Sequence, residues 1–314
     1  MEEQYKNMYT QPTKRPQRRF WHLWGPLIIK LGITYLVSIA FTLVLFVLYF
    51  KSKGIVTMEA MQAYMSSQSA AQSTYMAMLN ESTKYLVLVD GIATAVTIPI
   101  MFFMFHRDRV KEKAMGVVQP EKAKAWKYFA VIGIAVALCI GLNCLIIMSG
   151  LSPRDEAYQE TMTVMYSAPM LVQVICLGIL APVCEELVFR GLMFKRLRAQ
   201  TGFLIAAIYS TTIFAVIHGN MVQIIYAFVM GMVFAYVYEK YGSVKAPILA
   251  HIGANMVSLI CTELDSFGWM LEDPIRIKVI TIACAAIASS MYVFIQRIDE
   301  KTENNENEEG PTVA

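Results

Sequence analysis

Long apolar segments are the feature that most restricts the fold of this 314-residue chain. A helix that crosses the hydrocarbon core of a bilayer needs about 20 apolar residues, and it satisfies its own backbone polar groups. With 56% hydrophobic and only 16% charged residues, a water-soluble domain of this size could not bury so much apolar surface. The sequence therefore predicts an all-α polytopic membrane helical bundle of about eight transmembrane helices, at residues 27–50, 85–105, 128–150, 168–190, 203–219, 221–238, 244–262 and 277–297.

The chain divides into three parts by composition. Residues 1–26 are polar and basic, and they predict a flexible cytoplasmic arm. Residues 27–298 hold all the apolar segments and predict the transmembrane domain, in which residues 168–262 carry the polar motifs described below. Residues 299–314 are acidic and lack apolar periodicity, so we expect a disordered cytoplasmic tail. The longest predicted outer loop, 51–84, has methionines at helical spacing, which indicates a helix on the outer surface.

The distribution of lysine and arginine predicts the orientation of the chain. Basic residues cluster before the first span, between the second and third spans, and after the fourth span, which places these segments and both termini in the cytoplasm. The acidic segments 151–167 and 263–274 then lie outside. We expect the basic loops to contact anionic lipid headgroups rather than nucleic acid, because they lack interleaved aromatic residues.

An acidic and basic motif ends the fourth apolar segment, at Glu185, Glu186 and Arg190. Charged groups inside a bilayer cost about 2.5–3.5 kcal/mol each on insertion scales, so they usually mark a functional site. Glu186 and Arg190 are four residues apart and can form an ion pair on one helical face, whereas Glu185 is rotated by about 100° and can face a cavity. The alternative interpretation is a cytoplasmic helix end with three solvated charges.

Two of the four histidines lie in apolar segments downstream. His218 follows Phe214 by four residues, and His251 precedes Asn255 by four, so each pair shares a helical face. A single histidine in an apolar helix is most often a hydrogen-bonded structural residue. Two in neighbouring spans indicate a shared polar cavity.

These residue types fit hydrolysis of an amide without a serine or cysteine nucleophile. A carboxylate in an apolar site can act as a general base on water, which predicts this role for Glu185, with His218 helping to orient the proton. His251 and Asn255 could donate to the developing oxyanion, and such donors contribute about 3–4 kcal/mol each. A second version uses the same residues as ligands, because Glu185, His218 and His251 could hold a divalent cation such as zinc. The sequence leaves open whether the cofactor is a metal ion or absent.

The three motifs resemble, in order and content, those of the type II CAAX prenyl endopeptidase and bacteriocin-processing (CPBP, or Abi) intramembrane protease family. The resemblance covers residues 168–262 and implies an eight-span fold with a polar cavity. It also implies that Glu185 activates water with help from His218, that His251 and Asn255 stabilise the oxyanion, and that Glu186 with Arg190 braces the site. Glu185 and His218 can meet only if the fourth helix runs unbroken from about residue 172 to 198, which we predict.

The function expected from these observations is an intramembrane endopeptidase of membrane-associated, prenylated or bacteriocin-type peptides, in a bacterial cell membrane. The alternative is a non-catalytic membrane regulator or bacteriocin self-immunity protein that uses the same cavity for binding. A transporter is less consistent with the sequence, because no inverted repeat is evident and the charges cluster at one depth. The sequence carries no signal for the oligomeric state or for one particular peptide.

Overall fold

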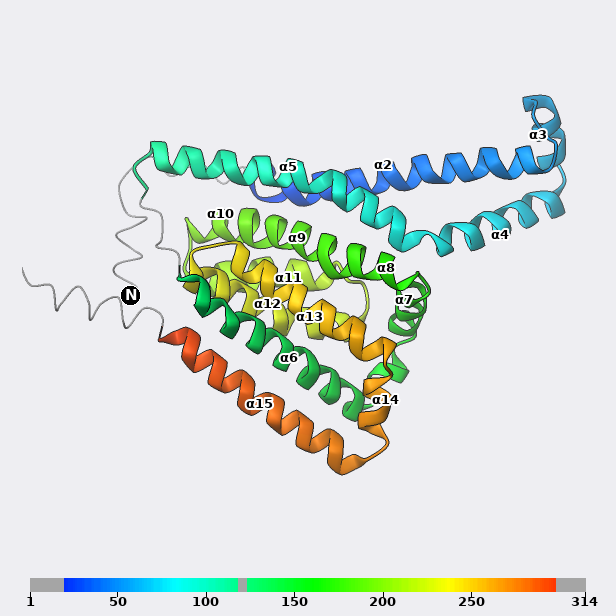
Figure 1. Ribbon diagram of the computed structural model, residues 1–314. Helices are drawn as coiled ribbons and strands as arrows, with labels where there is room; N and C mark the ends of the chain where they lie inside the picture. Colours follow the sequence, from blue (N-terminus) through cyan, green and yellow to red (C-terminus); the bar gives the residue numbers. More distant parts are fainter. Residues whose placement is uncertain (1–19, 118–122, 298–314) are drawn as a thin grey trace, which may run out of the picture.

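The computed structural model describes residues 20–117 and 123–297 (Figure 1). Every regular element in these residues is a helix, which confirms the predicted all-α class. The acidic tail predicted from residue 299 and most of the basic arm lie outside the described residues. Helix α2 begins at Phe20, before the start expected at residue 27.

The N-terminal helices form a layer on one side of the molecule. They are α2 (Phe20–Ser52), α3 (Met58–Met65), α4 (Gln68–Lys84) and α5 (Leu86–Ala114). Helices α2 and α5 pack along each other, while α3, α4 and the end of α2 extend beyond the remaining helices (Figure 1). The helix expected from the methionine spacing is α3, which runs from Met58 to Met65.

The remaining helices form the bundle beneath this layer. They are η1 (Ala125–Lys127), α6 (Tyr128–Ser149), η2 (Ser152–Arg154), α7 (Glu156–Tyr166), α8 (Met170–Gln173), η3 (Val174–Leu180), α9 (Ala181–Glu186), η4 (Leu187–Phe194), α10 (Lys195–Arg198), α11 (Phe203–Val216), α12 (Met221–Tyr241), α13 (Lys245–Glu263), α14 (Ser266–Leu271) and α15 (Pro274–Gln296). Helix α13 packs between α6 and the segment α8–α10, and α15 covers the far side of α6 (Figure 1).

Segments α8 to α10 form one unbroken helix from Met170 to Arg198, which we call the motif helix. Its extent agrees with the continuous helix predicted over about 172–198. It contains two π-helical stretches, η3 and η4, on either side of the α-helical turns that end at Glu186. Glu185 therefore lies near the middle of a long helix rather than at its end.

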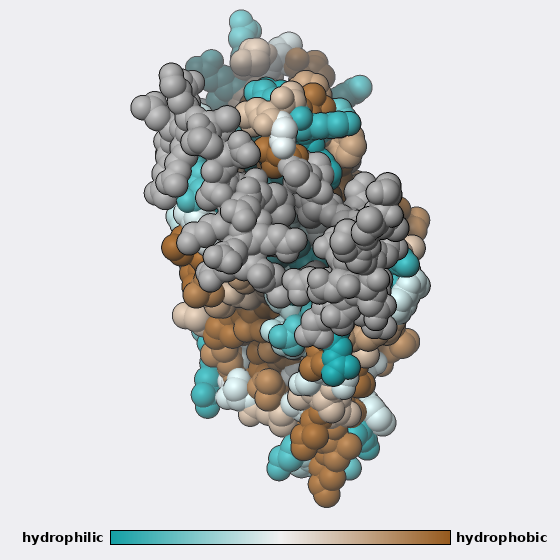
Figure 2. Space-filling model, turned by 90° about the vertical axis from the view of Figure 1, so that its left-hand side faces the viewer, coloured by the Kyte–Doolittle hydropathy of each residue, from teal (hydrophilic) through white to brown (hydrophobic). Residues whose placement is uncertain are grey.

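The surface of the molecule is that of a membrane protein. Leu43, Val47, Phe103 and Ile282 are each more than half exposed, as expected for side chains that face lipid. Brown hydrophobic areas cover much of the described surface at one end of the molecule, with teal hydrophilic groups between them (Figure 2).

Six described helices are long and apolar enough to cross a bilayer, compared with about eight predicted. The other two predicted spans correspond to α11, which has only 14 residues, and α13. Helix α13 has 19 residues but carries Lys245, His251 and Asn255, which lower its mean hydropathy. The polar residues that indicate a site thus make their own helix harder to recognise as a span. The six are Phe20–Ser52, Leu86–Ala114, Ala125–Ser149, Met170–Arg198, Met221–Tyr241 and Pro274–Gln296.

Candidate active site

A proline within the motif helix creates a free backbone acceptor near the site. In η3 the hydrogen bonds have π register, so the Ala181 N–H bonds the carbonyl of Cys176, five residues earlier. The next donor in this register would be residue 182, but Pro182 has no N–H. The carbonyl of Leu177 is therefore available, and it accepts a hydrogen bond of 2.8 Å from Asn255 Nδ2 of α13. π-helical turns are frequent at functional sites, where they free groups in this way.

Glu186 and Arg190 form the ion pair that their spacing predicts, and both side chains are fully buried. Arg190 Nη1 donates to Glu186 Oε1 at 3.0 Å, and Nη2 donates to the Gly231 carbonyl of α12 at 3.0 Å. Glu186 Oε2 and Arg190 Nε have no hydrogen-bond partner among the described residues. Removing one partner of a buried pair costs about 3–5 kcal/mol, so this pair ties the motif helix to α12.

Two aromatic rings enclose the Arg190 guanidinium. Its central carbon lies 4.6 Å from the ring centroid of Phe214 and 5.4 Å from that of Phe234. Phe234 also stacks on the imidazole of His251, with centroids 4.8 Å apart and an interplanar angle of 28°. Cation–π contacts of desolvated groups contribute about 2 kcal/mol, so these rings help to keep a charged group inside an apolar core.

His251 lies between the two glutamates. Its Nδ1 donates to Glu186 Oε1 at 2.9 Å, because that carboxylate oxygen can only accept when ionised. Its Nε2 is 3.8 Å from Glu185 Oε2. The exposed fraction of the Glu185 side chain is 18%, compared with zero for Glu186, so of the two carboxylates only Glu185 is open to water or a ligand.

His218 lies in the turn that follows α11 and is bonded to the last turn of that helix. Its Nδ1 is 2.8 Å from the Phe214 carbonyl, which must accept, so Nδ1 carries the hydrogen and the neutral ring keeps a lone pair on Nε2. The Phe214 ring contacts both imidazoles edge-on, with its centroid 5.0 Å from that of His218 and 5.9 Å from that of His251. Both histidines therefore border the same aromatic ring, and His218 offers one unoccupied nitrogen.

The Asn255 side-chain amide already makes one hydrogen bond to the motif helix. One of its two N–H groups can serve Leu177, which leaves one N–H and the carbonyl oxygen for other partners. The sequence predicted an Asn255 side chain directed at an oxyanion. In the structure the hydrogen bond to Leu177 fixes the direction in which the remaining N–H can point.

The described residues do not fit the zinc version of the site. Within residues 20–117 and 123–297, no group of three or more His, Cys, Asp and Glu side chains is arranged to hold a metal ion. His251 has committed Nδ1 to Glu186, and its other nitrogen faces Glu185. We therefore derive no chemical step through a cation bound by Glu185, His218 and His251.

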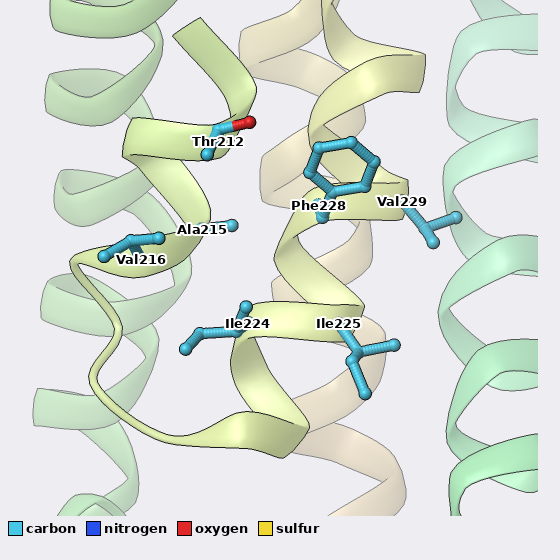
Figure 3. Close-up of a pocket in the computed structure, with 7 residues that line it drawn as sticks. All are labelled: Thr212, Ala215, Val216, Ile224, Ile225, Phe228 and Val229. Atoms are coloured by element: carbon cyan, nitrogen blue, oxygen red, sulfur yellow. The ribbon is translucent and has the colours of Figure 1, made fainter. Parts of the chain in front are cut away.

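A separate apolar groove of about 270 Å³ lies between α11 and α12 (Figure 3). No predicted site residue lines it, and its walls are aliphatic and aromatic side chains together with one threonine. The groove therefore offers no group for the chemistry discussed above. Its lining consists of Thr212, Ala215, Val216, Ile224, Ile225, Phe228 and Val229.

Sequence reasoning missed three contributors to this site: the ring of Phe234 and the backbone carbonyls of Gly231 and Leu177. The one available signal is the recurrence of small residues at every fourth position of α12, Ala227, Gly231 and Ala235, a spacing that is typical of close helix packing. A Cβ at Gly231 would lie 2.8 Å from Arg190 Nη2, so the absence of a side chain there admits the guanidinium. Phe234 gives no signal in an apolar helix.

The fold and the site define a helical membrane protein with a buried glutamate–arginine pair beside two histidines. Residues 167–257 match the family described as type II CAAX prenyl endopeptidase Rce1-like. The chain is 29% identical over 111 residues to YdiL of Bacillus subtilis (strain 168), a protein named as a candidate membrane peptidase. That alignment covers 35% of this chain and 45% of YdiL. No solved structure shows a significant match.

These matches agree with the resemblance that the three motifs predicted. Residues 167–257, which match the family model, contain all six predicted site residues. Over this segment the chain is similar to type II CAAX endopeptidase-like membrane proteins.

Proposed function

We propose that this chain is an intramembrane endopeptidase that hydrolyses peptide bonds of membrane-associated peptides with water activated by Glu185. The observation that carries the proposal is the position of His251 between a fully buried carboxylate and a partly open one. Glu186 is fully buried and its Oε1 accepts from both Arg190 and His251, whereas Glu185 makes no hydrogen bond within the described residues and is free to accept a proton from water. The family of residues 167–257 supports the same reaction class.

The reaction assigns a role to each polar group. The Glu185 carboxylate takes a proton as the water oxygen attacks the peptide carbonyl carbon, and the free Nε2 of His218 orients the water or shares that proton. The remaining N–H of Asn255 and His251 Nε2, when protonated, donate to the oxyanion. Glu185 then returns the proton to the leaving amine, so that the products are a carboxylic acid and an amine. Glu186 and Arg190 hold His251 in place and do not touch the peptide.

The substrate class and location are part of the same proposal. We infer that prenylated or bacteriocin-type peptides reach the site from the membrane, and that lipid surrounds the helices. The lysine and arginine distribution supports cytoplasmic termini, and the bacterial relative supports a bacterial cell membrane. The alternative, a non-catalytic regulator or immunity protein, uses the same cavity for binding only.

The test is peptide cleavage by the purified protein in lipid vesicles, with prenylated and unmodified peptides of identical sequence. We expect cleavage by the wild type, its loss in Glu185→Gln, and no effect of a metal chelator. Binding of the same peptides without cleavage would favour the regulator. Loss of activity on chelation, restored by one added metal, would contradict the water-activation mechanism.

A further inference from the structure

The first two predicted spans each contain one charged residue, and the two charges have opposite sign. Lys30 is the only charged residue in 27–50, and Asp90 is the only one in 85–105. Both lie outside residues 167–257, the part matched by the family. Charged groups at such positions are costly and usually functional, so each requires an explanation.

The packing of α2 and α5 brings both charges to the motif helix. Helices α2 and α5 contact each other, and both contact the motif helix. At Gly91 the backbone of α5 lies against the motif helix, because a Cβ there would lie 2.2 Å from Cys176 Sγ, and Asp90 is the adjacent residue. Lys30 and Asp90 are both half-buried. The position of Asp90 relative to η3 is therefore set by close packing of the Gly91 backbone against the Cys176 side chain.

Lys30 and Asp90 share an electrostatic environment with the proposed general base. The charges that act on Asp90 are Lys30 and Glu185, and the same three groups surround the thiol of Cys184. Neither Lys30 nor Asp90 makes a hydrogen bond or a close ion pair with another described residue. One ammonium group on α2 thus lies in the same electrostatic environment as two carboxylates, one from α5 and one from the motif helix.

Other charges near Glu185 are already compensated. Glu186 and Arg190, on the same helix, neutralise each other, and His251 from α13 is bonded to Glu186. Without Lys30, Glu185 and Asp90 would be two like charges in an apolar setting with no cation facing both. Like charges repel strongly where the effective dielectric constant is low, so Glu185 would move away from its place beside His251.

We propose that Lys30 and Asp90 are positioning residues of the active site, and that the Lys30 charge balances the two carboxylates so that Glu185 stays beside His251. The site then extends from the matched segment to α2 and α5. This inference rests on the proposed endopeptidase function.

The experiment measures kcat and KM of peptide cleavage for Lys30→Gln, Asp90→Asn, the double variant, and the conservative Lys30→Arg and Asp90→Glu. The control is Lys278→Gln, which removes an exposed lysine of α15, a helix that packs against α6. Thermal unfolding is recorded for every variant, so that loss of fold is separated from loss of activity.

Displacement of a general base lowers kcat more than it changes KM. We expect Lys30→Gln to lower kcat by about tenfold or more with KM nearly unchanged, because small displacements of catalytic groups reduce rates strongly. Lys30→Arg should keep most of the activity. The double variant should be at least about threefold more active than Lys30→Gln, because removing both charges leaves no uncompensated pair.

Two results would overturn the inference: a double variant whose loss equals the product of the single losses, or a Lys30→Gln variant as active as Lys278→Gln. If Lys30→Gln does not fold, the Lys30→Arg and Asp90→Asn variants decide the question by the same comparison. Failure of the proposed function looks different, because the wild type would then cleave no peptide at all.

Discussion

Glu185 and Glu186 are adjacent glutamates with opposite predicted roles, so the same substitution at each position tests the site directly. Glu186→Gln removes the counter-charge of Arg190 where both side chains have zero exposure. The glutamine still fits and can still accept hydrogen bonds, but the guanidinium is left as a buried uncompensated charge. Breaking a buried pair in this way costs about 3–5 kcal/mol.

Glu185→Gln changes the same atoms one residue earlier but should hardly affect stability. Its side chain is 18% exposed, and its nearest polar partner is His251 Nε2 at 3.8 Å. Substitutions outside buried networks change the free energy of unfolding by about 0.5 kcal/mol or less. We therefore expect Glu185→Gln to be stable and inactive, and Glu186→Gln to be unstable.

The cysteines of the chain allow the stability of the two variants to be compared. All six cysteines are free thiols, and all except Cys261 are buried, so a thiol-reactive fluorogenic dye reports unfolding on heating. The midpoint for Glu186→Gln should fall by several degrees, while that for Glu185→Gln should stay close to the wild type. Equal midpoints for Glu186→Gln and the wild type, or an equally large fall for Glu185→Gln, would refute this division of roles.

Three further predictions concern the supports of the site. Backbone N–H groups lower the pKa of Asp155 below its usual 3.8, chiefly that of Val222 in α12 and then that of Tyr158 in α7. The stability that the ionised Asp155 contributes is therefore lost as the pH falls below about 4. In Asp155→Asn the unfolding temperature should fall less on acidification than it does in the wild type. Gly231→Ala should destabilise by about 1–3 kcal/mol through overpacking, whereas Gly253→Ala, whose Cβ would meet only ordinary contacts, should be neutral in the same melting assay. Asn255→Ala should cost about 1–2 kcal/mol, because it leaves the partly buried Leu177 carbonyl without its side-chain donor, and it should also reduce cleavage; an unchanged melting point would show that this hydrogen bond contributes nothing.

The helical spacing of the motifs identified contacts that form within one helix. The pair Glu186–Arg190 and the contact between Phe214 and His218 both follow from a four-residue spacing, which fixes neighbours whatever the rest of the fold does. The fold class could equally be predicted from the sequence, because helices let apolar segments of bilayer length pair all their backbone N–H and C=O groups inside the membrane. The number of spans was less so, because the polar residues of α13 and the short α11 weaken the hydropathy signal.

Contacts between helices required the tertiary structure. The stacking of Phe234 on His251, the Gly231 carbonyl that receives Arg190, and the approach of Asp90 to the motif helix join residues far apart in sequence. An apolar phenylalanine or a glycine looks the same in sequence whether it faces lipid or a buried guanidinium. The sequence by itself determined the membrane class, the family resemblance of one segment and the ion pair within one helix, since these depend on local spacing. The packing of separate helices decided which glutamate is fully buried and which is partly open, because burial is a property of the neighbours that the fold brings together.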